Sequence, residues 1–201
     1  ANGTMVAWCW KAGGTAVSNT DGSITSTVSA NQAAGFSIVK YTAGSSTNFT
    51  QAVGHGLSQA PQMIIQKRTD SSSSNWYVIF TALDGSIDYM NLNTDSAKTD
   101  METADSGAYV NFTIGNTGFS DWWGGSYNII NYCFHDIAGY QKIGTYTGTG
   151  SSNTINVGFK PKFLLIKGNL DSTNWVIVDN QRDNADEWLY ANTTDGTYDD
   201  G

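Results

Sequence analysis

The sequence contains few charged residues and very little proline, cysteine or histidine. Of its 201 residues, 14% are Asp, Glu, Lys or Arg, and proline, cysteine and histidine each occur twice. No apolar run approaches the length of about 18 residues that indicates a membrane-spanning helix. A basic, apolar signal peptide is also missing from its start, so nothing supports export by the Sec pathway. We therefore expect no membrane span.

The charge that is present is mostly negative, with a formal net charge of -8. Nucleic-acid binding needs a basic surface that displaces counterions from phosphates, and adhesion to anionic lipids needs the same charge. The sequence therefore predicts no nucleic-acid partner and no membrane partner. Its acidic surface is expected to keep the protein in solution.

Aromatic residues, glycine and small polar residues make up much of the sequence. Aromatic residues account for 12%, with seven tryptophans, and there are 22 glycines. Such residues fit pleated sheets and tight turns. Short apolar or alternating runs between turn residues predict strands over residues 36–41, 63–67, 76–80, 89–92, 109–114 and 127–134. We predict an all-β protein, an antiparallel β-sandwich that resembles a jelly roll.

Four blocks of the sequence recur in the same order, which indicates two diverged repeat units. The offset is 104 residues between Gly35 and Gly139, and 99 residues between Asn75 and Asn174. The paired blocks are GFSIVKYTAG and GYQKIGTYTGTG, VGHGLSQAPQMIIQK and VGFKPKFLLIK, NWYVI and NWVIV, and YMNLNTD and WLYANTTD.

A fifth block places the unit boundaries. SYNIINYCFHD resembles GTMVAWCWKAG near the start of the chain, which aligns Cys133 with Cys9. We predict that residues 1–34 hold the end strand of a preceding unit and a Ser/Thr/Asn/Gly-rich insertion. Residues 35–138 then form a first complete unit, and residues 139–201 form a second, truncated unit.

The truncated unit is expected to expose sheet edges, which favour pairing with another strand. Residues 3–11 resemble the missing cysteine strand and could fill the gap, either in the same molecule or in a neighbour. Alternatively, the chain is a fragment of a longer polypeptide with further copies. The sequence leaves these alternatives open.

The two cysteines lie in aromatic, strand-like runs, residues 8–10 and 132–134. A thiol in such surroundings packs as a small hydrophobic group. We predict that Cys9 and Cys133 are buried free thiols, with a disulfide as the alternative.

Candidate catalytic groups are sparse. A glycosidase needs two carboxyl groups about 5–9.5 Å apart, but Glu102 and Glu187 fall at non-equivalent positions of the two units. His55 lies in a predicted turn, and His135 follows the cysteine strand, so both are expected to be structural or surface residues. We predict no catalytic residue, no cofactor and no enzymatic activity.

One oxygen-rich cluster is a weak candidate for a calcium site. It comprises Asp183, Asp186 and Glu187, whose carboxylates are ligands that calcium accepts. The cluster lacks the spacing and the glycine of an EF-hand loop, so no metal is expected.

Tryptophan provides the candidate ligand-binding residues. Trp76 and Trp175 recur between the units and are expected in the core. Trp122 and Trp123 are consecutive in a glycine-flanked loop. Because successive side chains of a strand alternate between its faces, the two tryptophans cannot point to the same face. The favoured interpretation is that this loop plugs the core. The alternative is that one of the two is exposed as a platform for a sugar ring or a protein partner.

Five segments also resemble a known family: residues 5–14, 21–42, 132–151, 157–167 and 174–183, with YCFHDIAGY as the most specific stretch. They are similar to a repeat domain in virion structural proteins of tailed phages, especially marine phages, that are often described as tail-fibre-like and of unknown function. In that family the domain accompanies concanavalin- or laminin-G-like sandwiches.

The resemblance implies a structural protein of the virion exterior, such as a fibre, spike or decoration module with a role in host-surface attachment. Its implied partners are other virion subunits or copies of itself in a homo-oligomer, and a host-surface glycan. A lectin-like module for carbohydrate binding or adhesion is the alternative. A polysaccharide depolymerase is a weaker third reading.

Overall fold

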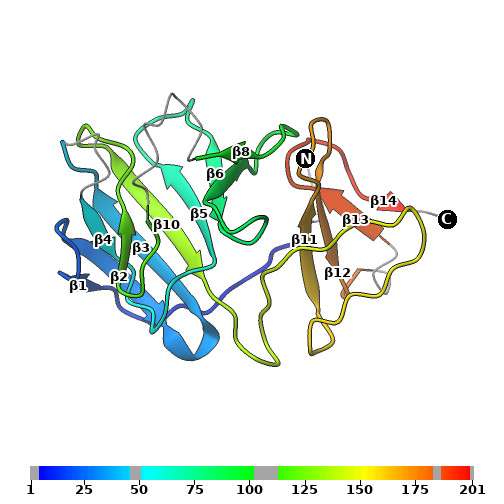
Figure 1. The fold of residues 1–201 in the computed structure, drawn as a ribbon, viewed down its shortest axis with the longest axis horizontal. Helices are drawn as coiled ribbons and strands as arrows, with labels where there is room; N and C mark the ends of the chain where they lie inside the picture. Colours follow the sequence, from blue (N-terminus) through cyan, green and yellow to red (C-terminus); the bar gives the residue numbers. More distant parts are fainter. Residues whose placement is uncertain (1–4, 46–50, 102–112, 183–186, 200–201) are drawn as a thin grey trace.

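The computed structural model describes residues 5–45, 51–101, 113–182 and 187–199. Within these ranges the regular elements are strands and one short 3₁₀ helix, η1 (Gln32–Ala34), and no helix is long and apolar enough to cross a membrane. Figure 1 shows two β bodies side by side. This architecture confirms the predicted fold class, an all-β antiparallel sandwich with two related units.

The first body is centred on a sheet that has eight strands in the described part of the chain, here called the large sheet. Its order is β1-β2-β3-β10-β5-β6-β7-β8, and every neighbouring pair is antiparallel. The strands are β1 (Val17–Asn19), β2 (Ser26–Asn31), β3 (Phe36–Thr42), β5 (Met63–Arg68), β6 (Trp76–Phe80), β7 (Asp88–Asn91), β8 (Thr99–Asp100) and β10 (Asn128–Phe134).

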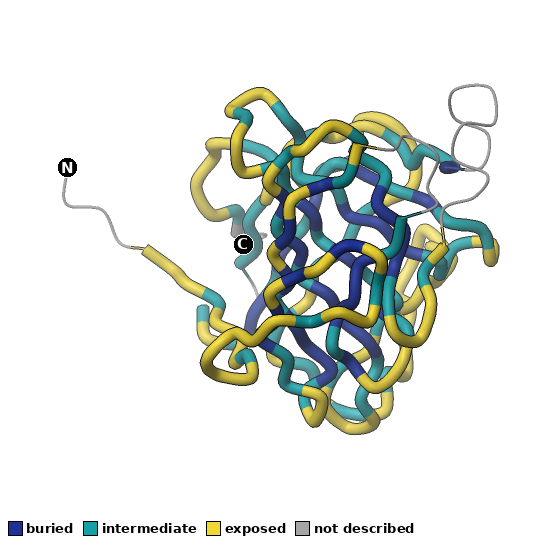
Figure 2. Tube along the Cα trace, turned by 90° about the vertical axis from the view of Figure 1, so that its left-hand side faces the viewer, coloured by how far each residue is buried: buried dark blue, intermediate teal, exposed yellow. Residues whose placement is uncertain are grey.

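One face of the large sheet packs against β4 (Ala52–Gly54) and β9 (Gly118–Ser120), which pair with each other. Successive side chains of a strand point to opposite faces, so alternate residues of the large sheet enter this core. Figure 2 shows the buried segments running through the middle of the body, with exposed residues at the turns. The least exposed apolar members of the core are Val39, Val53, Ile64, Ile79, Met101, Phe119, Ile129 and Cys133.

The second body is the small sheet, which has four strands in the described residues. Its order is β11-β12-β13-β14, with β11 (Phe163–Lys167), β12 (Trp175–Asp179), β13 (Glu187–Tyr190) and β14 (Tyr198–Asp199). Trp175 connects it to the outer face of the large sheet, where the tryptophan packs in a cluster with Val78, Phe80 and Met90. The two sheets thus share a second, smaller core.

The strands β5 to β8 and β11 to β14 follow the same order with the same register. Each residue of the second set lies 99 or 100 positions after its equivalent in the first. The equivalent opposed pairs are Lys67–Trp76 and Lys167–Trp175, Tyr77–Asn91 and Val176–Tyr190, and Asp88–Asp100 and Glu187–Asp199.

A side-chain clamp also recurs at the turn after β7 and after β13. Asn93 Oδ1 accepts a hydrogen bond from the Trp76 backbone N–H at 2.9 Å, and Asn93 Nδ2 donates to Asn75 Oδ1 at 3.0 Å. In the second unit Asn192 makes the same two bonds, both at 2.8 Å, to Trp175 and Asn174. The asparagines of the repeated blocks therefore fix the two hairpins in the same way.

Several expectations about single segments need correction. Cys9 is exposed and residues 5–16 form no strand, because this segment lacks ladder partners on either side; Cys133 is buried as predicted, and both thiols are free. Trp76 is only half-buried and stacks on Tyr132 outside the cluster around Trp175, whereas Trp175 is 5% exposed. The insertion at residues 16–34 supplies β1 and β2 and extends the large sheet. The unit boundaries at residues 35 and 139 stay predictions.

Candidate functional site

Four aromatic side chains line a depression of about 260 Å³ on the first body: Tyr77, Tyr89, Trp122 and Trp123. We call it the aromatic depression. The rings meet edge to face, with centroids 4.8 Å apart for Tyr77 and Trp122, 5.5 Å for Tyr89 and Trp122, and 5.8 Å for Trp122 and Trp123. This is the preferred geometry of aromatic pairs, so the rings hold each other in place.

A buried carboxylate holds the loop that carries the two tryptophans. Asp121 Oδ1 accepts hydrogen bonds from the Tyr41 hydroxyl at 3.3 Å and from the Trp123 backbone N–H at 3.2 Å. Its Oδ2 accepts a third from the Gly44 N–H at 2.9 Å. Burial raises the pKa of Asp121 above its ordinary value, and these bonds offset part of that effect. Asp121 is therefore a structural group that sets the path of the loop.

Trp123 is fixed from its other end. Its Nε1 donates to Gln66 Oε1 at 2.6 Å, and Gln66 Nε2 donates to Asn131 Oδ1 at 2.8 Å. Gln66 and Asn131 lie on neighbouring strands of the large sheet and are both buried. This buried amide pair positions the indole over the sheet.

The structure brings the two predicted residues together but exposes neither fully. Trp122 and Trp123 are both half-buried and pack against the main core. The loop thus covers the core and at the same time forms one wall of the aromatic depression. The prediction that one of them contacts a ligand stays a prediction.

Tyr77 and Tyr89 form the opposite wall and were missed by sequence reasoning. Tyr77 lies on β6 and Tyr89 on β7, where Tyr89 stands opposite Ile79, two residues from Tyr77. Their shared face follows from this register, which the sequence alone does not specify. The available signal was period-two spacing, because Tyr77 and the core residue Ile79 face the same side.

The histidines lie in packed surroundings. His55 Nδ1 accepts a hydrogen bond from the Leu57 N–H at 3.1 Å, and His55 Nε2 lies 3.0 Å from Gly115 O. Burial lowers the pKa of His55. His135 Nδ1 lies 2.6 Å from Gln59 Nε2 and is itself buried. Each imidazole therefore has a partner in a loop of the first body.

The predicted metal cluster cannot be assembled from the described residues. Glu187 begins β13, and Asp183 and Asp186 lie outside the described part of the chain. Among the residues that are described, no group of three His, Cys, Asp or Glu side chains is placed to hold a metal ion. Glu102 also lies outside these ranges.

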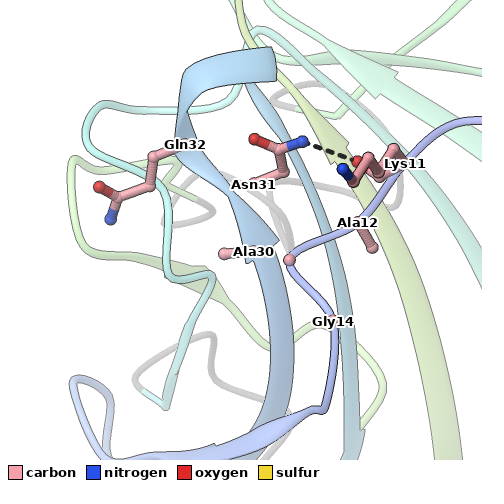
Figure 3. A pocket seen from close by; sticks show the side chains of 7 residues that line it. Lys11, Ala12, Gly14, Ala30, Asn31 and Gln32 are labelled. Carbon is pink, nitrogen blue, oxygen red and sulfur yellow. Dashed lines mark hydrogen bonds between the residues drawn. The ribbon is translucent and has the colours of Figure 1, made fainter.

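A second, more open depression of about 760 Å³ lies between residues 11–14 and β2 (Figure 3). Asn31 Nδ2 donates to Lys11 O at 3.0 Å, and the Ser29 hydroxyl donates to Gly14 O at 2.8 Å. A Cβ atom on Gly13 would lie 1.9 Å from Ala30 O, so only glycine fits here. Lys11 is the one ionisable side chain in the lining of this depression. We therefore interpret the depression as the place where residues 11–14 pack against β2, and not as a ligand site.

Together these features define an antiparallel β-sandwich protein with an aromatic surface depression. The chain belongs to the family described as Domain of unknown function (DUF7483), whose family model matches residues 1–200. No curated protein and no solved structure matches it.

Proposed function

We propose that the protein is a non-enzymatic structural module on the exterior of a tailed-phage virion, as part of a fibre, spike or decoration that contributes to host-surface attachment. The observation that carries this proposal is the repeated four-strand meander, whose two copies pack on each other around Trp175. Tandem β-units with such an interface form rigid, extendable shapes. The sequence resemblance to phage virion proteins supports the same assignment.

The proposal is tested on the particle itself. Purified virions of a phage that encodes this chain are labelled with a gold-conjugated antibody raised against the protein, and antibody absorbed with free protein serves as control. We expect gold on an outer appendage or on the capsid surface, and the chain among the virion proteins by mass spectrometry. Its presence in infected cells together with its absence from particles would reject the proposal.

Carbohydrate binding is the second candidate, and the aromatic depression favours it. Aromatic rings offer flat apolar faces at low entropic cost, and pockets of this kind combine them with a few polar groups. The Tyr77 and Tyr89 hydroxyls belong to residues of its lining, whereas the indole N–H of Trp123 is donated to Gln66. The ligand class is a pyranose ring of a surface polysaccharide.

A glycan array followed by calorimetry tests this second candidate. For any glycan that binds, Trp122→Ala is expected to weaken binding roughly tenfold or more, the scale of an aromatic hot spot. Tyr146→Ala is the matched control, since Tyr146 is 52% exposed and lies outside the lining. Equal losses in both variants, or no glycan bound, would remove the depression as a sugar site.

A further inference from the structure

The small sheet has an open edge at β11. In the described residues β11 pairs with β12 only, whereas its equivalent β5 pairs with both β6 and β10. Asn180 N–H donates to Lys162 O at 3.2 Å, so by alternation Phe163, Leu165 and Lys167 direct their backbone groups away from β12. This row of N–H and C=O groups is equivalent to the edge of β5 that pairs with β10 in the large sheet.

The repeat identifies the kind of strand that fits this edge. In the large sheet Cys133 lies opposite Ile64, and Phe134 lies opposite Met63. The same chain carries a second copy of this pattern at residues 5–10, with Cys9 and Trp10 at the positions of Cys133 and Phe134. Transfer of the register places Cys9 opposite Leu164 and Trp10 opposite Phe163.

The segment from Met5 to Trp10, here called the N-terminal arm, already touches this edge. The ring centroids of Trp10 and Phe163 are 5.4 Å apart, and those of Trp8 and Phe163 are 5.7 Å apart. Trp8 Nε1 also donates to Asp179 Oδ2 at 3.2 Å. Both indoles therefore lie on the face that Phe163 shares with Asp179, which is the face the transferred register requires.

The residues that follow the arm are held against β2, whereas Met5 at its start is exposed. Residues 11–14 are held against β2 by the Asn31–Lys11 hydrogen bond drawn in Figure 3 and by the bond from the Ser29 hydroxyl to Gly14 O. Met5 is 91% exposed, and Figure 2 shows the beginning of the described chain projecting from the body. To lie along β11, residues 5–9 have to move relative to residues 11–14.

We propose that the N-terminal arm binds the open edge of β11 in the same molecule as an antiparallel strand, with Trp10 opposite Phe163, Cys9 opposite Leu164 and Trp8 opposite Leu165. The arm then takes the place in the small sheet that β10 takes in the large sheet. Trp8 and Trp10 extend the core around Trp175, and Cys9 lies on the outer face beside Leu164. The edge is a binding site for an extended peptide with an aromatic–small–aromatic triplet.

A disulfide trap tests the register with the native Cys9. Cys9 and residue 164 form a non-hydrogen-bonded pair, whose Cα atoms are about 4.5 Å apart and within disulfide range. Leu164→Cys is tolerable because Leu164 is 38% exposed. Diamide takes up the electrons and protons of both thiols when the bridge forms. Ile166→Cys is the control, since a diagonal neighbour lies about 7–8 Å away, beyond disulfide range.

We expect Leu164→Cys to lose two of its three thiols, those of Cys9 and residue 164, within a monomer on a non-reducing gel, while Cys133 stays reduced. Ile166→Cys should keep all three. Covalent dimers of Leu164→Cys would show that a second copy supplies the strand, and equal crosslinking of both variants would show no register. Either result overturns the proposal. Independently of any variant, slow exchange of the Leu165 amide hydrogen in the native protein supports it, and exchange at the rate of an open edge refutes it.

Discussion

Trp175 is the residue on which the contact between the two sheets depends most. It is 5% exposed, its ring packs with Val78, Phe80 and Met90, and its Nε1 donates to Asn91 O at 2.8 Å. Removal of a buried tryptophan leaves a cavity and an unpaired carbonyl. We expect Trp175→Ala to lower the free energy of unfolding by about 3–5 kcal/mol, measured by urea denaturation.

The equivalent residue of the first unit provides the control for this substitution. Trp76 is half-buried and stacks on Tyr132 with centroids 6.5 Å apart. Trp76→Ala should therefore cost clearly less than Trp175→Ala. Equal costs would mean that the small sheet is not anchored by Trp175.

The two thiols should differ in reactivity. Cys133 is fully buried, and burial raises the pKa of its thiol from 9.0 to about 12, whereas Cys9 is exposed. Because the thiolate is the reactive form, a disulfide reagent at pH 8 should titrate Cys9 at once and Cys133 only after unfolding in guanidinium. Rapid reaction of both thiols in the native protein would contradict the buried position of Cys133.

The same shift in pKa has a consequence for stability at alkaline pH. Between pH 9 and about 12 the folded protein keeps the Cys133 proton that the unfolded chain releases. The folded state then binds more protons, so the free energy of unfolding falls as the pH rises through this window. Cys133→Ala should flatten that decline in urea denaturation curves measured at successive pH values.

At the scale of the elements, the asparagine clamps are the clearest shared device. Asn93→Ala and Asn192→Ala each remove the acceptor for a tryptophan N–H at the start of a strand. We expect each to lower the free energy of unfolding by about 1 kcal/mol, the usual net value of such a bond. Thr94→Ala is the control, because within the described part of the chain Thr94 bonds only to its neighbours Asn91 and Ser96. A loss in one unit alone would show that the clamps are not equivalent.

The hairpins of both units were predictable from the sequence, and strands β1 and β2 were not. NWYVI and NWVIV combine β-forming residues with flanking turn residues, so their strands appear at the predicted places. β2 lacks such a pattern: Val28 is its one large apolar residue that is buried, beside Ser26 and Ser29. Ser26 is tolerated there because its hydroxyl donates to Gly54 O at 2.9 Å, a tertiary contact that sequence patterns do not reveal.

The candidate site was predictable in part for a similar reason. Two adjacent tryptophans between glycines are visible in the sequence, and they do form one wall of the aromatic depression. The other wall depends on the register of β6 and β7, and the support depends on Asp121, which reaches Gly44 from 77 positions away. Long-range contacts of this kind follow from the fold and not from local spacing.

At the scale of the whole molecule, equivalent faces of the two meanders pack against each other. Ile65 and Leu165 occupy equivalent positions, and both pack against the cluster around Trp175. The loops add contacts, since Ala97 N–H donates to Asp171 Oδ1 at 2.8 Å and Lys98 N–H donates to Asn169 O at 3.2 Å. The strand patterns predict two apolar faces but not which of them meet, so this arrangement had to come from the structure.

The face of the small sheet that points away from the large sheet is poorly covered, and this makes the small sheet the less stable of the two bodies. Its members on β11 and β12 include Leu164, Ile166, Val176 and Val178, which are half-buried or exposed, whereas the equivalent Ile64 and Ile79 are fully buried under β9. Local opening costs least where few apolar contacts are lost. Amide hydrogens of β13 should therefore exchange faster than those of β10 in mass-spectrometric hydrogen exchange. Equal protection of both strands would mean that the outer face of the small sheet is covered in solution, and a concentration dependence of that protection would identify a second copy of the chain as the cover.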